Sequence, residues 1–340
     1  MYSASKRIIH FIPNLCVGGA ETFLIRLIPL LSTKHQVVIL FWNTKKIPAA
    51  RIHCISSFCK VICIDPFNTS FASLSSFFGL LISLSHEDYV FSWLHLSDFL
   101  ASIIKLIHPR NFKLFWNIRN IPIIHSQYSH LTFICYYLCL YLFKWIPDKV
   151  IFNSSTAKKS FLERGLPSSK CIVIHNGFNI SSLPYYTRSV HDPFTIVCCA
   201  RFHPQKNHIL LLESFALFKQ KCPDALLRLI GPGCDSSNSK LMSCLKDLGI
   251  VGSVVLHSVL PYNDTLSIMR RSHISMLLSS FGESFPNVVA ESIICGCYPI
   301  ATDVGDSSYI IRSKGKIFPV NSSPHEIYSY LLLLLYKALL

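Results

Sequence analysis

The sequence predicts an α/β protein built from two successive Rossmann-like units, each with a parallel sheet. Short apolar runs, many of them β-branched, alternate with helix-like segments along the 340-residue chain, and such alternation is typical of a parallel sheet covered on both faces. The alternation stops at 176–194, where Pro, Gly, Ser and Thr give a linker composition, and then it starts again. Because a domain has roughly 100–200 residues, we place two domains at 1–180 and 181–340.

The composition favours a large buried core. Hydrophobic residues make up 51% of the chain and charged residues 15%, which excludes a disordered protein. Lys6 and Arg7 precede an apolar run, but His10 and Pro13 interrupt it and no small-residue cleavage site follows, so we predict a first strand rather than a signal peptide. The fourteen cysteines form no CxxC pair, which favours small apolar fillers in a reduced cytosolic protein over structural zinc.

The charge is unevenly distributed. The net charge is +11 over residues 1–180 and +3 over 181–340. A basic first half suggests an anionic membrane surface or a diphosphate-linked acceptor as partner, with an ordinary solvated surface as the alternative. The apolar stretch Leu131–Phe143 is too short to span a bilayer, so it is either a core helix or a helix in the membrane interface. We therefore expect a cytoplasmic protein, peripheral on the inner face of the cytoplasmic membrane, with no nucleic-acid partner.

The first half contains six predicted strands separated mostly by helical segments. They are Arg7–Ile12, Gln36–Trp42, Lys60–Ile64, Tyr89–Trp93, Lys113–Ile118 and Lys149–Asn153. A loop with Gly18 and Gly19 follows the first strand and leads into a predicted helix, Glu21–Leu31. Paired glycines at a helix start let a phosphate or a sugar approach the backbone, but the loop lacks the GxGxxG pattern of nicotinamide dehydrogenases.

The second half contains five predicted strands. They are Phe194–Ala200, Ala225–Ile230, Val254–Leu256, Ile274–Leu278 and Tyr298–Ala301. Ligands of open α/β sheets bind beyond the carboxyl ends of the strands, so the residues that follow each strand are candidates. Arg201 and Lys206 lie between the first of these strands and a predicted helix, Ile209–Phe218. Two cations there suit phosphate oxygens, although they also fit an ordinary surface loop. Gly231 forms a turn after the next strand.

The segment 281–291 is the most informative. Pro286 suits the first turn of a helix, and Gly296 suits its end. Glu283 then lies in the loop before the helix and Glu291 on it. The backbone amides at the helix start form an anion site, to which we assign Phe285, Pro286, Asn287 and Val288. Two carboxylates beside it can accept hydrogen bonds from sugar hydroxyls; the alternative is a capping Glu and a surface Glu.

Taken together, these motifs resemble the group 1 family of retaining glycosyltransferases, which have the two-domain GT-B architecture. The resemblance is carried by GGAE at 18–21, FNSSTAKKSFLERG at 152–165, IHNGF at 174–178, ARFHPQKNH at 200–208, LIGPG at 229–233 and FGESFPNVVAESIICGCYPIATDVGD at 281–306. The segments occur in the family's order and cover almost the whole chain. The most specific is the pair of glutamates separated by seven residues, with its central PN and the TDVGD that follows.

The resemblance implies roles for these residues. Arg201 and Lys206 are expected to bind the donor diphosphate, and the amides of Phe285–Val288 are expected to hold a phosphate oxygen. Glu283 is expected to contact the donor sugar, and Glu291 the ribose. Gly18 and Gly19 are expected to lie beside the donor. It also implies a retaining reaction without metal or other cofactor, in which the protein stabilises the departing diphosphate. The sequence contains no Asp-x-Asp, the usual metal-binding device of the other large transferase fold.

The sequence departs from the family pattern in three places. Arg119 stands near the place where many members have a first-domain His, so we regard His95, Trp116 and Arg119 as candidates on the acceptor side, although for His95 a structural role is favoured. Ser258 stands where a glycine is common. The sequence ends at Leu340, whereas many members continue into a helix that crosses back to the first domain.

The resulting expectation is a hexosyltransferase. We expect a UDP-sugar donor and a lipid-diphosphate-linked oligosaccharide acceptor, in the biosynthesis of lipopolysaccharide, O-antigen or capsule. A GT-B nucleotide-sugar epimerase is the alternative enzyme, and a degenerate transferase that serves as a binding partner is the alternative outside catalysis.

Overall fold

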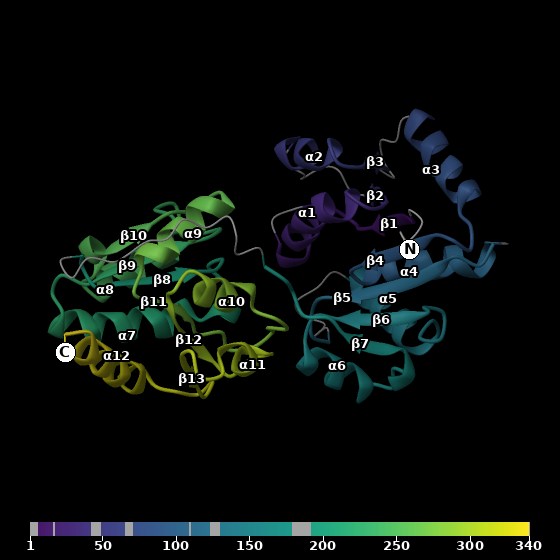
Figure 1. Ribbon diagram of the computed structural model, residues 1–340. Helices are drawn as coiled ribbons and strands as arrows, with labels where there is room; N and C mark the ends of the chain where they lie inside the picture. Colours follow the sequence, from purple (N-terminus) through teal and green to yellow (C-terminus); the bar gives the residue numbers. More distant parts are fainter. Residues whose placement is uncertain are drawn as a thin grey trace. The chain divides into compact units, whose positions relative to one another are not determined.

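The computed structural model describes residues 6–15, 18–41, 49–64, 71–108, 110–122, 130–178 and 192–339. The chain divides into two compact units, Met1–Asn176 and Gly177–Leu340, and each has its own sheet and its own core (Figure 1). Most of the predicted linker at 176–194, and Trp42 at the end of a predicted strand, lie outside the described residues.

Unit 1 contains a parallel sheet that has seven strands within the described residues. Its order is β3-β2-β1-β4-β5-β6-β7. The strands are β1 (Arg7–Phe11), β2 (Gln36–Phe41), β3 (Lys60–Cys63), β4 (Tyr89–Trp93), β5 (Lys113–Ile118), β6 (Lys149–Phe152) and β7 (Cys171–Val173). β1 pairs with both β2 and β4, so the order reverses between β1 and β4. The three-residue β7, which pairs with β6, was not predicted.

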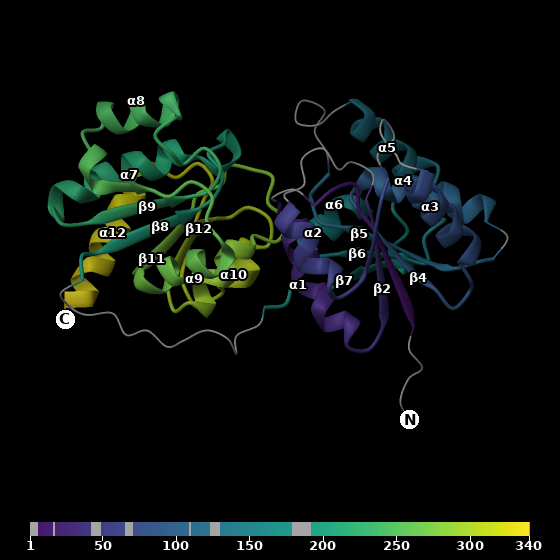
Figure 2. The same ribbon diagram turned by 90° about the horizontal axis from the view of Figure 1, so that it is seen from above.

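Helices cover both faces of this sheet (Figure 2). The described helices are α1 (Gly19–Ser32), α2 (Ala49–Ser56), α3 (Phe71–Ser83), α4 (His95–Ile107), α5 (His130–Tyr141) and α6 (Ser155–Leu162). Apolar side chains of α1 and α2 pack around Trp93 on one face, and α3 to α6 cover the other. Each fully buried Leu, Ile or Phe contributes roughly 1.5–3 kcal/mol, so these cores fix the ends of the strands from which the candidate residues project.

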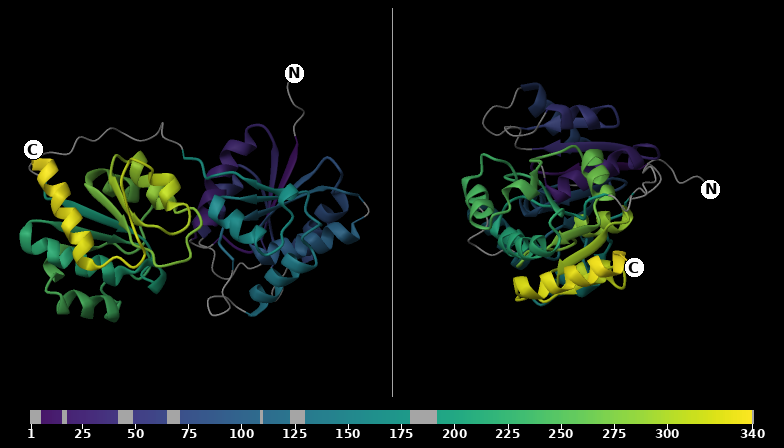
Figure 3. Two further views of the ribbon diagram at one scale, coloured as in Figure 1. Left: turned by 90° about the horizontal axis from the view of Figure 1, so that it is seen from below. Right: turned by 90° about the vertical axis from the view of Figure 1, so that its left-hand side faces the viewer.

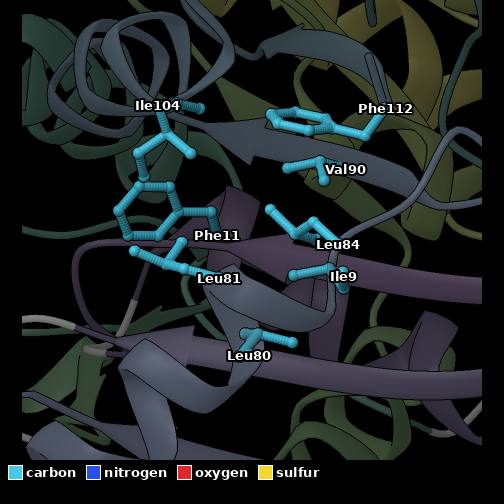
Figure 4. A pocket seen from close by; sticks show the side chains of 9 residues that line it. Ile9, Phe11, Leu80, Leu81, Leu84, Val90, Ile104 and Phe112 are labelled. Carbon is cyan, nitrogen blue, oxygen red and sulfur yellow. The ribbon is translucent and has the colours of Figure 1, made fainter. Parts of the chain in front are cut away.

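A small cavity of about 20 Å³ lies in the core beneath α3 and α4 (Figure 4). Its lining is entirely apolar: Ile9, Phe11, Leu80, Leu81, Leu84, Val90, Ala101, Ile104 and Phe112. A space of this size holds about one water, which needs two or more polar partners to stay there. The cavity is therefore a packing gap rather than a site for a sugar or a nucleotide.

Unit 2 repeats the architecture with six strands in the part of the chain that the structure describes. The order is β10-β9-β8-β11-β12-β13. The strands are β8 (Thr195–Cys199), β9 (Leu226–Ile230), β10 (Val254–Leu256), β11 (Ile274–Leu277), β12 (Tyr298–Thr302) and β13 (Lys316–Phe318). β8 pairs with β9 and β11, so the reversal lies between β8 and β11. The prediction of parallel sheets in two α/β units is confirmed.

The helices of unit 2 also form two layers (Figures 2 and 3). They are α7 (His208–Lys221), α8 (Ser239–Asp247), α9 (Tyr262–Arg271), α10 (Asn287–Ile294), α11 (Ser307–Ile311) and α12 (Pro324–Leu339). α7, α8 and α12 share the larger core on one face, where α12 lies against α7, and α9 and α10 cover the other face. Among the described helices of the whole chain, none is long and apolar enough to cross a bilayer.

Candidate functional site

The candidate residues of unit 2 gather where its strand order reverses. The loop after β8 carries Arg201 and Lys206, and the loop after β11 carries Glu283. The chain leaves β8 for α7 on one face and leaves β11 for α10 on the other, and such a divergence opens a crevice at the carboxyl ends of two neighbouring strands. The two loops stay joined by the backbone amide of Ser280, which donates to the carbonyl of Gln205 at 2.8 Å.

Local hydrogen bonds shape the loop after β8. His203 precedes a short 3₁₀ turn, Pro204–Lys206, and its Nδ1 accepts from the amide of Gln205 at 3.2 Å. Asn207 then adopts a left-handed conformation with φ +47° and caps α7. Arg201 is exposed, and its Nη2 donates to Oε1 of Gln205 at 3.1 Å. The loop thus presents one cation to solvent while Lys206 turns inward.

Lys206 forms an ion pair with Glu283. Nζ of Lys206 donates to Oε1 of Glu283, which also accepts from the hydroxyl of Ser279 at 2.6 Å. Ser279 is held in turn, because its carbonyl accepts from the hydroxyl of Thr302 at 2.6 Å. Glu283 is only 8% exposed. Sequence reasoning missed Ser279 and Thr302; the signal for Ser279 is a hydroxyl directly after a buried strand.

Two glycines hold these loops by allowing close backbone approach. Gly231 has φ +142°, and a Cβ there would lie 2.5 Å from the carbonyl oxygen of Ala200. Gly305 has φ +62°, and a Cβ there would lie 2.6 Å from the carbonyl oxygens of both Glu283 and Ser284. Gly231 therefore packs against the backbone that leads to Arg201, and the TDVGD segment packs against the backbone of Glu283.

The start of α10 lies directly after Glu283. The helix begins at Asn287 with Pro286 at the preceding cap position, so Pro286 stands one residue earlier than its predicted place in the first turn. The amide of Val289 donates to the carbonyl of Pro286 at 3.0 Å. Phe285 stacks on Phe178 with ring centroids 6.4 Å apart, which fixes the chain as it enters the helix.

The end of α10 confirms the predicted role of Gly296. This residue has φ +69°, its amide donates to the carbonyl of Ile293 at 3.0 Å, and the amide of Cys297 donates to the carbonyl of Ser292 at 2.9 Å. This is the hydrogen-bond pair of a Schellman cap. The helix is thereby fixed at both ends, and Glu291 lies one turn inside it.

Glu291 lies close to the carboxyl end of β8. Burial raises the pKa of the Cys199 thiol well above its usual range, and the negative charges of Cys198 and Glu291 raise it further. Cys199 is the last residue of β8, two residues before Arg201. The second carboxylate and the exposed cation therefore belong to the same corner of unit 2.

Ser258 stands at the position where the family often has glycine, and its backbone is left-handed. Its φ is +47°, which is uncommon for a residue with a side chain. Two hydrogen bonds hold it: its amide donates to the carbonyl of Cys234 at 2.9 Å, and its carbonyl accepts from the amide of Gly231 at 2.6 Å. The replacement therefore keeps the turn beside Gly231.

Unit 1 has its own reversal between β1 and β4, and the predicted glycines lie there. Gly18 precedes α1, with extended backbone, and Gly19 is the first residue of the helix. The side chain of Glu21 folds back onto Gly18, where any Cβ would overlap with its carboxylate. Burial raises the pKa of Glu21, and the charge of Arg51 opposes this shift. Gly18 thus makes room for a carboxylate at the helix start.

The candidates on the acceptor side separate into two groups. His95 is 3% exposed; its Nδ1 lies 3.6 Å from a carboxylate oxygen of Asp98, and its ring packs against Tyr136. Trp116 is 1% exposed, and its indole N–H donates to the hydroxyl of Ser102 at 3.1 Å. The structure places both of these side chains in the core. Arg119 instead lies just beyond the end of β5, at the carboxyl edge of the sheet.

In the described ranges, no three His, Cys, Asp or Glu side chains are grouped so that they could hold a metal ion. The charged candidate residues of unit 2 are Arg201, Lys206, Glu283 and Glu291. This set can bind a diphosphate through its cations and sugar or ribose hydroxyls through its carboxylates.

Comparisons with known proteins agree with this geometry. The family model described as Glycosyl transferases group 1 matches residues 186–337, and that described as Glycosyltransferase Family 4 matches residues 17–182. A Campylobacter jejuni protein, N-acetylgalactosamine-N,N'-diacetylbacillosaminyl-diphospho-undecaprenol 4-alpha-N-acetylgalactosaminyltransferase, is 24% identical over 309 residues, covering 86% of this chain and 80% of its own.

Two solved structures illustrate the fold. Anabaena HepE in complex with UDP-glucose is similar with a TM-score of 0.78 at 18% identity, over 98% of this chain and 90% of its own. The lipopolysaccharide outer core galactosyltransferase WaaB in its apo form is similar with a TM-score of 0.68 at 17% identity, over 96% and 89%. The predicted GT-B fold is thereby confirmed.

Proposed function

This chain belongs to the group 1 glycosyltransferases, and we propose that it transfers a sugar from a UDP-sugar to a lipid-diphosphate-linked oligosaccharide, with retention of configuration, in the assembly of a surface polysaccharide. The observation that carries the assignment of roles is the ion pair between Lys206 and Glu283. It brings together Lys206, which is predicted to bind the diphosphate, and Glu283, which is predicted to bind the sugar.

The chemistry of the donor requires this proximity. In a nucleotide sugar, the anomeric carbon and the β-phosphorus are joined through a single oxygen. When the acceptor hydroxyl attacks that carbon, the bond to this oxygen breaks and negative charge grows on the diphosphate, one oxygen of which takes up the proton that the acceptor hydroxyl loses. Lys206 and Arg201 stabilise that charge, while Glu283 accepts hydrogen bonds from hydroxyls of the sugar.

Donor binding also changes the pairing of Lys206. Without donor, this ammonium group neutralises Glu283. With donor, the phosphate oxygens become a second anionic partner for it, and the Glu283 oxygen is released in part for the sugar. Because the carboxylate keeps its hydrogen bond from Ser279, it stays in place during this exchange. The two cations provide the charge neutralisation that we assign to this site, so the proposed reaction uses no metal or other cofactor.

The relatives support the donor and the acceptor. HepE was solved with UDP-glucose, which supports UDP as the carrier. The Campylobacter relative is named for transfer to a diphospho-undecaprenol-linked sugar, and WaaB for the lipopolysaccharide outer core. These names support a lipid-diphosphate acceptor and a role in lipopolysaccharide, O-antigen or capsule formation.

We propose that the protein reaches this lipid-linked acceptor at an anionic membrane, which unit 1 contacts peripherally. α5 has two apolar faces: Cys135, Tyr136, Cys139 and Leu140 are buried in the core, whereas Leu131, Ile134, Tyr141, Leu142 and Trp145 are exposed on this helix and directly after it. Trp145 is 61% exposed, and the Lys170 ammonium group donates to its carbonyl. An exposed indole on a unit of net positive charge suits the headgroup region of a bilayer.

The test is a nucleoside-diphosphate release assay over a panel of donors with a crude lipid-linked acceptor. UDP release that depends on the acceptor is the expected result. A donor whose sugar is interconverted in the absence of acceptor would instead identify an epimerase, and no release from any UDP-sugar would contradict the proposed donor.

A further inference from the structure

Arg119 occupies the part of unit 1 where the sheet order reverses. It follows β5, and β5 pairs with β4. Its guanidinium carbon lies 4.3 Å from the ring centroid of Phe23, which belongs to α1, and 4.9 Å from that of Trp93, the last residue of β4. The planar cation therefore lies against two neighbouring aromatic rings, whose centroids are 6.3 Å apart, at the carboxyl edge of the sheet.

The supports of this cation are themselves fixed. Nδ1 of His10 accepts the indole N–H of Trp93 at 3.1 Å. Burial lowers the pKa of His10 to about 3, so the imidazole is neutral at pH 7 and suited to accept. Trp93 is fully buried. The ring that stacks on Arg119 therefore cannot move away from it without loss of a buried hydrogen bond.

The hydrogen bonds of Arg119 go to neutral groups. Nε donates to the amide oxygen of Asn117 at 2.8 Å, and Nη1 donates to the amide oxygen of Asn176. Among the residues that the structure describes, no carboxylate pairs with it and Nη2 has no acceptor. Burial lowers the pKa of Arg119 to about 9, and no acidic neighbour opposes this shift. The group is still protonated at pH 7.

A mostly buried cation without a counter-ion is unfavourable unless something else pairs with it. The amides and the rings orient the guanidinium but do not neutralise it, and its Nη2 edge is left without a protein acceptor. Arg119 is only partly buried by exposed surface area, so a ligand can reach this edge. Guanidinium binds carboxylate and phosphate oxygens in its own plane with paired hydrogen bonds.

We propose that Arg119 is a binding residue for an oxyanion of the substrate, which its Nη2 edge contacts in the plane of the guanidinium group. This inference rests on the proposed function, because that function supplies two substrates with such oxygens. One is the diphosphate of the lipid-linked acceptor, and the other is the carboxylate of an acidic sugar. Both present the same paired oxygens to Arg119, and the experiment distinguishes them.

The experiment uses the full-length chain with Arg201→Ala and Lys206→Ala, which remove the two cations that we assign to the donor diphosphate in unit 2. Calorimetry measures the binding of inorganic pyrophosphate and, separately, of glucuronate. In this background Arg119→Gln is compared with Arg164→Gln, which removes an exposed guanidinium of unit 1 that donates to the backbone carbonyl of Ser160. We expect at least one probe to bind, Arg119→Gln to weaken it by about 10- to 100-fold, and Arg164→Gln to leave it unchanged.

The outcomes divide cleanly. Binding of pyrophosphate alone assigns the site to the acceptor diphosphate, and binding of glucuronate alone assigns it to an acidic sugar. Binding of neither probe, or an equal effect of the two Gln variants, overturns the proposal. If Arg119→Gln does not fold, Arg119→Lys replaces it, because an ammonium keeps the charge but loses the planar pairing and should weaken the same probe by about tenfold. UDP binding and UDP release by the unmodified chain test the proposed function separately.

Discussion

Replacing Gly305 with alanine should displace Glu283 without touching any group that contacts the substrate. Gly305 has φ +62°, and its added Cβ would lie 2.6 Å from the carbonyl oxygens of Glu283 and Ser284, whereas ordinary contact begins at 3.4 Å. The backbone of Glu283 must therefore move by about 0.8 Å. A left-handed alanine costs about 1–2 kcal/mol, and the overlap adds about 1–3 kcal/mol.

The chain offers a matched control for the first of these two effects. Gly249 has φ +66°, but a Cβ there would meet nothing within 4 Å. Gly249→Ala should therefore lower the free energy of unfolding by about 1–2 kcal/mol and leave turnover unchanged. The difference between the two variants in free energy of unfolding and in kcat isolates the effect of displacing Glu283.

Activity is the decisive readout. Because a misplacement of about 1 Å at a reacting group can reduce the rate about 10²-fold, Gly305→Ala should lower kcat by about that factor. UDP binding should remain, since the carbonyl oxygens that the added Cβ would meet belong to Glu283 and Ser284 rather than to Arg201 or Glu291. UDP release and calorimetry with UDP measure these effects, and urea unfolding measures stability. If Gly305→Ala and Gly249→Ala had the same stability and the same kcat, Gly305 would not be what positions Glu283.

Four other outcomes follow from the site. Lys206→Ala should lower kcat about 10²-fold or more, because it removes a cation at the departing diphosphate; a change confined to the donor KM would contradict this. Glu291→Ala should raise the donor KM and weaken UDP binding in calorimetry. Glu283→Ala frees Lys206 from its ion pair and should bind UDP no more weakly than the unmodified chain. If both variants weakened UDP binding equally, the separate assignments to ribose and sugar would be refuted. Turnover should survive EDTA, and restoration of a lost activity by Mn²⁺ would count against the role of the cations. More of the protein should float with anionic liposomes than with neutral ones, and this fraction should fall with added salt and in Trp145→Ser. Flotation that does not depend on lipid charge would disprove the electrostatic contribution.

The sequence by itself determined the local structure and the chemistry of the site. Apolar runs marked the positions of eleven strands, since burial on both faces of a parallel sheet leaves a local signal. Arg201 and Glu283 were found because each follows such a strand, where ligands of α/β sheets bind, whereas Arg119 was found through the resemblance to the family. The end of α10 was predicted from Gly296, because few other residues adopt its left-handed conformation.

The tertiary structure decided which of these groups meet. β7 and β13, of three residues each, were not predicted, and each is a strand because it pairs with a neighbouring strand of the sheet. Strand order decided the ion pair of Lys206 with Glu283 across 77 residues, and it placed the uncompensated Arg119 against two neighbouring rings. A residue's own neighbours in sequence fix its conformation, but its partners depend on which strands lie side by side, and that is settled by the burial of the whole chain.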